Sequence, residues 1–333
     1  MKTKDKKKTS SKRKLAPAIA MLTTSAVMLT TATYAWFTIG KEAQVTGLEM
    51  SATAGGGLEI SLGKINASKL SAPGMADGTL WKSSCSVAEV YKSVGKINPA
   101  STVDGNNLYY VESGVGGQGK TVSDTSVVKQ ATDSAKLTLQ TENTANADKT
   151  TSSEDGAGHY VDIPMWIRTT SAVDQNIKCA VTIDNTADNQ GTDLKKAVRV
   201  AVIPVSTSKN DSVSKKDTTG VTLSTSSTYT DTIKAIFGLD QTGYNENKGI
   251  SKEKTASDPS TYSAILGAVS NFKEAGATAS DVFDLAKATS GNYSVQGFVV
   301  RVWLEGESTS CWDENAGQDW NISLKFTADD AQS

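Results

Sequence analysis

The stretch HYVDIPMWIRTT, residues 159–170, decides the fold class of this chain. Every second residue is apolar, and these residues share one face of an extended chain: Val161, Ile163, Met165 and Ile167. The other face holds three larger side chains: Tyr160, Trp166 and Arg168. Period-two alternation is typical of a β-strand with one face on the core. Pro164 cannot donate a ladder hydrogen bond, so it predicts an edge strand or a bulge.

The same alternation recurs on both sides of this stretch. It appears in GLEISLG (57–63), AKLTLQT (135–141), NIKCAVTID (176–184), LKKAVRVAVIP (194–204), YSVQGFVVRVWLEGE (293–307) and WNISLKFTA (320–328). The last two segments are expected to pair as a hairpin with a long loop. About eight to ten strands at this spacing predict an all-β protein, an antiparallel β-sandwich that is jelly-roll-like.

Residues between these strands are rich in Gly, Ser, Thr, Asn and Asp, which form turns. Long loops are therefore expected at 64–135 and 205–290. Within the second loop, TYSAILGAVSNFKEAG (261–276) carries apolar residues at helical spacing. We expect one small helical insertion there and a short helical turn at 280–287. Residues 36–333 are expected to form a single sandwich domain.

The first 35 residues resemble an export signal. Residues 1–14 contain seven lysines, one arginine and one acid, and no charged residue occurs from Leu15 to Gly40. Small residues at Thr33 and Ala35 predict cleavage between Ala35 and Trp36, or after Ala32. The alternative is a retained N-terminal membrane anchor, in which Tyr34, Trp36 and Phe37 lie at the membrane interface. This segment is the only part expected to contact a membrane.

The net charge bounds the class of partner. The whole chain has 34 basic and 36 acidic residues. Residues 1–35 contain 8 of the basic and 1 of the acidic residues, so the remaining chain has 26 and 35, a net charge of −9. An acidic exported chain lacks the basic footprint that nucleic acid binding requires, so no nucleic acid partner is expected.

The three cysteines are Cys85, Cys179 and Cys311. Cys179 shares the apolar face of its strand, which predicts a buried thiol. Cys85 and Cys311 lie in turn-rich stretches beside Trp81 and Trp312, and they are the candidate pair for one disulfide bond outside the cell.

No catalytic constellation stands out in the sequence, and the chain is not expected to be an enzyme. Its one histidine, His159, has no cysteine or serine partner in a known motif, so we expect an exposed or edge histidine. A two-histidine zinc site is excluded by the same count. Carboxylates beside tryptophans are the remaining candidates for sugar chemistry: Glu305 and Glu307 after Trp303, and Asp313 and Glu314 beside Trp312.

Calcium is the one cofactor that the sequence allows, and otherwise none is expected. The turns at 184–193 and 312–319 are rich in acids and amides, which supply oxygen ligands. The candidate ligands are Asp184, Asp188, Asp193 and Asp313. Neither turn matches an EF-hand loop, and turn formation by itself explains the same composition.

Residues 12–62 resemble the leader and first strand of the TasA/camelysin family of exported Gram-positive proteins. The shared features are the basic start, the Thr/Ala-rich core, a small residue (Ala35) before the aromatic pair Trp36-Phe37, and an extended segment that follows. The resemblance implies processing by a SipW-type signal peptidase, a jelly-roll sandwich, and a location outside the cell or on the surface of a Gram-positive bacterium. It also implies self-association into biofilm matrix fibres, in which the N-terminal strand of one subunit completes the sheet of the next.

Cleavage after Ala35 would leave WFTIGKEAQV as a free extended arm. Its candidate contact residues are Trp36, Phe37, Ile39 and Val45. An extended apolar segment can add to the open edge of a neighbouring sheet. We therefore expect a structural surface or matrix protein. The alternatives are a carbohydrate-binding or hydrolytic sandwich, with Trp303, Trp312 or Trp320 as the stacking platform, and a membrane-anchored surface protein.

Overall fold

The computed structural model describes residues 45–53, 57–66, 69–86, 91–93, 96–111, 128–131, 136–137, 140–141, 157–185, 194–223, 229–239, 248–254, 262–308, 310–311 and 320–330. Within these ranges the chain forms 23 strands and one 3₁₀ turn, Leu194–Ala197. The expected all-β sandwich is therefore confirmed. Many of the additional strands have only two or three residues, which is why they leave no alternation in the sequence.

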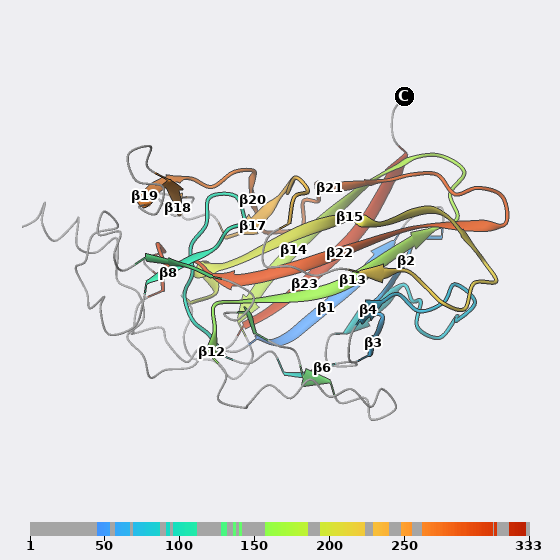
Figure 1. The fold of residues 1–333 in the computed structure, drawn as a ribbon, viewed down its shortest axis with the longest axis horizontal. Helices are drawn as coiled ribbons and strands as arrows, with labels where there is room; N and C mark the ends of the chain where they lie inside the picture. Colours follow the sequence, from blue (N-terminus) through green and yellow to red (C-terminus); the bar gives the residue numbers. More distant parts are fainter. Residues whose placement is uncertain are drawn as a thin grey trace, which may run out of the picture.

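Two sheets form the body of the protein, and their long strands run along its long axis (Figure 1). The five-stranded sheet has the order β21 (Ser280–Leu285), β14 (Gln175–Asn185), β23 (Trp320–Asp330), β1 (Val45–Thr53) and β5 (Ser84–Ser86). The seven-stranded sheet has the order β10 (Lys136–Leu137), β13 (Tyr160–Thr169), β22 (Asn292–Leu304), β15 (Val198–Ser214), β17 (Ile236–Gly238) and β20 (Phe272–Glu274), and β2 (Glu59–Ser61) also pairs with β13.

Antiparallel pairing dominates both sheets, but three pairs are parallel: β1 with β23, β10 with β13, and β17 with β20. The sandwich is therefore mixed, and the jelly-roll connectivity stays a prediction. The expected hairpin of the last two long strands is wrong. β22 lies in the seven-stranded sheet between β13 and β15, and β23 lies in the five-stranded sheet between β14 and β1.

Shorter strand pairs lie outside these sheets. They are β3 (Lys64–Asn66) with β4 (Lys69–Ser71) and β16 (Thr222–Leu223); β6 (Tyr91–Ser93) with β11 (Gln140–Thr141); β7 (Lys96–Ile97) with β12 (Ala157–Gly158); β8 (Tyr109–Val111) with β9 (Val128–Gln130); and β18 (Lys248–Lys254) with β19 (Tyr262–Ala268). Strands thus occupy much of the described part of the two segments expected to be loops.

The first core lies between the two sheets. Its members are the alternating apolar residues of β13, β14, β22 and β23, including Val161, Ile163, Met165, Ile177, Val181, Val300, Ile322 and Phe326. The faces assigned from the sequence to β13, β14 and β23 are therefore confirmed. Full burial of each such side chain contributes about 1.5–3 kcal/mol relative to exposure.

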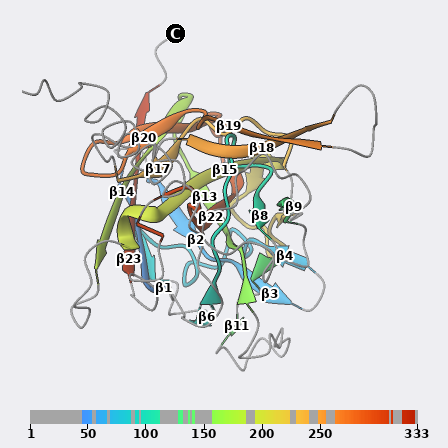
Figure 2. The same cartoon turned by 90° about the vertical axis from the view of Figure 1, so that its left-hand side faces the viewer.

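A second core covers the outer face of the seven-stranded sheet. Tyr160, Trp166, Val299 and Trp303 of the sheet pack there against residues of the 64–135 and 215–235 segments, including Met75, Trp81, Leu108, Tyr229 and Ile233. Both faces of the seven-stranded sheet are therefore buried. The described parts of the segments expected to be long loops cover its outer face and form this second core with it. In Figure 2 the short strands β3, β4 and β8 appear to the right of β13 and β22.

The helix expected at 261–276 is wrong. Its residues form β19 with β18 as partner, and then β20, which pairs in parallel with β17. The helical turn expected at 280–287 is also wrong, since Ser280–Leu285 is strand β21 on the edge of the five-stranded sheet. Among the residues that the structure describes, no helix is long and apolar enough to cross a membrane.

Candidate functional site

The N-terminal strand β1 is an integral part of the five-stranded sheet. It pairs in parallel with β23 from Val45, opposite Trp320, to Thr53, opposite Thr327. On its other side it pairs with β5 through residues 49–51. Val45, expected in the free arm, is therefore bound within its own chain, and that part of the prediction is wrong. The cleavage residues Ala35 and Trp36 and the arm residues Phe37 and Ile39 lie outside the described residues.

The expected sugar-stacking platform is not present at two of its three tryptophans. Trp303 and Trp320 are both fully buried, one in the second core and one in the first. A sugar ring stacks only on an exposed aromatic face, so neither ring can serve. Trp312, with its neighbours Asp313 and Glu314, lies outside the described residues.

Glu305 and Glu307 do come together, at the turn after β22. The backbone N–H of Glu307 donates to Glu305 Oε1 (3.2 Å), and Trp303 Nε1–H donates to Glu305 Oε2 (3.4 Å). Burial raises the pKa of Glu305 to about 7, although the Arg199 charge and hydrogen bonds from Ser101, Glu307 and Trp303 lower it in part.

Both carboxyl groups are sealed from solvent, since Glu305 is 0% and Glu307 4% exposed. A glycosidase pair must face a cleft that admits a sugar and a water molecule. The buried position of this pair gives the acids a structural role at the turn rather than contact with a substrate.

The thiol of Cys311 lies in the same buried region, and the pKa of Cys311 is raised well above its usual value by burial and by the Glu305 charge. The predicted bridge between Cys85 and Cys311 is not formed, because all three cysteines are buried thiols in the structure. The burial predicted for Cys179 is confirmed, and desolvation raises the pKa of this thiol far above its usual range.

Of the four calcium candidates, the structure describes only Asp184, which is exposed at the end of β14. Asp188, Asp193 and Asp313 lie outside the described residues. Within the described ranges, no group of three His, Cys, Asp or Glu side chains is arranged to hold a metal ion.

His159 is half-buried rather than exposed. Its ring stacks on Tyr110 with 3.8 Å between the ring centroids, and its Nδ1 lies 3.0 Å from the carbonyl oxygen of Pro99. Burial lowers the pKa of His159, while the hydrogen bond with Pro99 raises it in part. Through these two contacts the His159 side chain connects the start of β13 with Pro99 and Tyr110.

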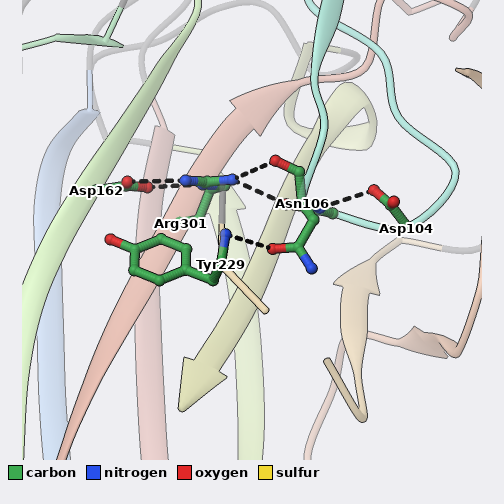
Figure 3. A network of polar contacts seen from close by, with 6 residues as sticks. Asp104, Asn106, Asp162, Tyr229 and Arg301 are labelled. Carbon is green, nitrogen blue, oxygen red and sulfur yellow. Dashed lines mark hydrogen bonds and ion pairs between the residues drawn. The ribbon is translucent and has the colours of Figure 1, made fainter. Parts of the chain in front are cut away.

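Sequence reasoning missed a layer of buried arginines on the outer face of the seven-stranded sheet. Arg301 on β22 forms a two-pronged ion pair with Asp162 on β13. It also donates through Nη1 to the carbonyl oxygens of Gly105 (3.1 Å) and Asn106 (2.9 Å), as Figure 3 shows in part. The guanidinium lies over the rings of Tyr160 and Tyr229.

The loop bound by Arg301 is also organised from within. Asp104 Oδ1 accepts hydrogen bonds from the backbone N–H groups of Asn106 (2.8 Å) and Asn107 (3.0 Å). Asn106 Oδ1 accepts one from the N–H of Tyr229 (3.2 Å). One loop thus presents two carbonyls to the arginine and an amide to a segment more than a hundred residues away (Figure 3).

Two further arginines, Arg168 and Arg199, belong to this layer. Arg168 on β13 binds Glu59 on β2 (2.8 Å) and donates to the carbonyl oxygen of Met75 (2.8 Å). Its guanidinium lies over the rings of Trp81 and Tyr293.

Arg199 on β15 donates to the carbonyl oxygens of Lys196 (2.7 Å) and Val198 (3.0 Å). Its side chain lies so close to Gly238 that a Cβ there would be 2.8 Å from Arg199 Cδ. The glycine therefore leaves the space that this arginine occupies. A single arginine inside an otherwise apolar strand, as in VRVAVIP and VVRVW, is the signal that could have identified this layer.

The described structure therefore contains no accessible catalytic or metal site among the predicted residues. Its functional candidate is the N-terminal strand and the chain that leads into it. Comparison of the chain with protein-family models, with curated proteins and with solved structures finds no match in any of the three.

Proposed function

We propose that this chain is an exported structural protein that assembles into extracellular filaments through its N-terminal arm, residues 36–44. One observation carries the proposal: β1 starts at Val45 as a paired strand of the sandwich, directly after the apolar arm sequence WFTIGKEAQ. Binding of a segment with Trp36, Phe37 and Ile39 is stabilised by the burial of these side chains and by the ladder hydrogen bonds that form.

The proposed partner is a second copy of the chain, and the proposed location is the exterior of a Gram-positive bacterium, reached through a SipW-type peptidase. The buried positions of Trp303 and Trp320 exclude two of the three tryptophans that a carbohydrate-binding function would use. A filament follows from strand addition when the donor and acceptor surfaces differ, because a head-to-tail contact does not close on itself.

The intact mass and N-terminal sequence of the protein recovered outside the cell provide the first test. A chain that starts at Trp36, or at Thr33, is the expected result. A chain that keeps Lys2–Lys14 would contradict release and would identify a membrane-anchored protein.

Electron microscopy of the purified mature chain provides the second test. We expect filaments from residues 36–333 and their loss in the triple variant Trp36→Ser, Phe37→Ser, Ile39→Ser. The matched control is the variant Thr38→Ser, Lys41→Gln, which keeps the apolar side chains and is expected to assemble. Filaments that persist in the triple variant would exclude the arm as the assembly element.

A further inference from the structure

Among the described strands, β14 has a paired neighbour along only half of one of its two edges. β23 pairs with β14 along its whole length, from Gln175 to Asn185. On the opposite side, β21 pairs with β14 only from Gln175 to Cys179. Among the described strands, none pairs with this side of residues 180–185, here called the open half of β14. In Figure 2 β14 lies at the outer left flank of the molecule.

The open half has the sequence AVTIDN, which favours strand pairing. Val181 and Ile183 are buried in the first core, and Thr182 and Asp184 are exposed on the outer face. Natural edge strands are usually protected by lysine, proline or a bulge. This segment has no lysine or proline, and its pairing with β23 is regular. About half of its backbone N–H and C=O groups point toward the open side.

A surface depression lies where the pairing of β21 with β14 ends. It is an open depression of about 410 Å³, lined by Lys178, Lys234, Lys273, Ala279, Ser280 and Asp281. Ser280 is the last β21 residue that pairs with β14, opposite Cys179. The depression therefore adjoins the end of the β21–β14 pairing.

We propose that the open half of β14 is the acceptor for residues 36–44 of a second copy of this chain. This inference rests on the proposed function and names its binding surface. Extended, the arm spans about 30 Å, and the open half about 20 Å, so the arm can cover it completely. Phe37 and Ile39 share one face of an extended arm. That face would lie over the edge of the first core, to which Val181 and Ile183 belong.

The topology favours a second copy over the chain's own arm. Val45 pairs with Trp320, and Trp320 pairs with Asn185, so all three lie in one row at the same end of the sheet. The arm of the same chain would have to turn back and pass β23 and β14, about 14 Å at the usual strand spacing. That path takes at least about four of its nine residues and leaves too few for the six positions of the open half.

Donor and acceptor then belong to different strands, β1 and β14, on opposite sides of β23. The contact is heterologous, so each copy can donate to one neighbour and accept from another. This arrangement extends into a filament rather than closing into a symmetric dimer.

Disulfide trapping between two full-length mature chains tests the proposal. One carries Thr38→Cys in the arm, and the other carries Thr182→Cys or Asp184→Cys on the exposed face of the open half. The matched control is Glu49→Cys, an exposed position on β1 that has β23 on one side and β5 on the other. The native cysteines are buried and do not compete. Under a mild oxidant, we expect at least tenfold more mixed dimer with the β14 variants than with the control.

The outcomes separate this inference from the proposed function. Filaments that need the arm, together with equal trapping at Glu49→Cys and at β14, would overturn the acceptor and leave the function intact. A double variant, Thr38→Cys with Asp184→Cys, that closes its disulfide within one chain in dilute solution would assign the open half to the chain's own arm. Failure of the arm to support any assembly would overturn both.

Discussion

Arg301 and Asp162 face each other across β22 and β13 as a fully buried ion pair. Arg301 Nε lies 2.8 Å from Asp162 Oδ1, and Arg301 Nη2 lies 2.9 Å from Asp162 Oδ2. Their side chains are 0% and 2% exposed. Because the remaining guanidinium donor binds carbonyls of the 105–106 loop, the pair joins the seven-stranded sheet to the segment that covers it.

Replacement of Asp162 by alanine should therefore destabilise the protein by about 3–5 kcal/mol, because it leaves the Arg301 charge buried without its partner. The matched control is Asp284→Ala, which breaks the exposed pair between Lys234 and Asp284. That change should cost less than about 1 kcal/mol. Urea unfolding of the mature chain measures both, and equal costs would contradict a structural role for the buried pair.

Glu305 should make the protein less stable as pH rises. Its folded-state pKa is about 7 against an ordinary value of 4.5, so ionisation of the buried carboxyl opposes folding. The stabilising contribution is fully present below pH 4.5 and is lost as pH rises through 7. The full loss is on the order of 3 kcal/mol.

Thermal unfolding at pH 5 and pH 8.5 checks this expectation by comparison of the wild type with Glu305→Gln. The variant removes the titration while it keeps the size of the side chain, so the difference between the two proteins should change with pH in the stated direction. A difference that stays constant across this range would show that Glu305 is ionised at both pH values.

Gly220 should not tolerate a side chain. It has a φ of +78°, and a Cβ there would lie 2.0 Å from the carbonyl oxygen of Ala72. Gly291 has nearly the same φ, +79°, with open space around the Cβ position. Gly291→Ala should therefore cost only the backbone strain, about 1–2 kcal/mol, and Gly220→Ala clearly more. Chemical denaturation of the two variants measures both costs. Similar costs would mean that the backbone at Ala72 moves away from a side chain at position 220 with little loss of stability.

The three cysteines should behave as protected thiols. Titration of the folded protein with a thiol reagent should show almost no rapid reaction, because the thiolate forms only where solvent reaches the sulfur. The unfolded, non-reduced protein should react with three equivalents of the reagent, one for each cysteine. One equivalent would instead show that two of the cysteines form a disulfide bond.

The long strands could be predicted from the sequence because their alternation is local. HYVDIPMWIRTT forms β13, and Pro164 lies where β13 is flanked by β22 alone among the described strands, between the stretches paired with β10 and β2. Burial of Leu58, Ile60 and Leu62 also follows the predicted face.

The helix predicted at 261–276 failed for a non-local reason. Ile265, Leu266, Val269 and Phe272 have helical spacing, but the segment is a strand paired with Lys248–Lys254 from Ala268 back to Tyr262. A break follows at Asn271, whose φ of 55° is left-handed, before β20 begins. Short periodic segments are ambiguous, and the available strand partner decides between the two forms.

The sequence by itself determined the sandwich class, the inward faces of the long strands and the apolar arm before Val45, because each depends on the order of neighbouring residues. Only the tertiary structure decided that Trp303, Trp320, Glu305 and three arginines are buried, and that half of β14 pairs on one side only among the described strands. Burial and strand pairing depend on segments that lie far apart in the chain, such as Gly105 and Arg301, which are 196 positions apart, and no local pattern encodes which of these segments meet.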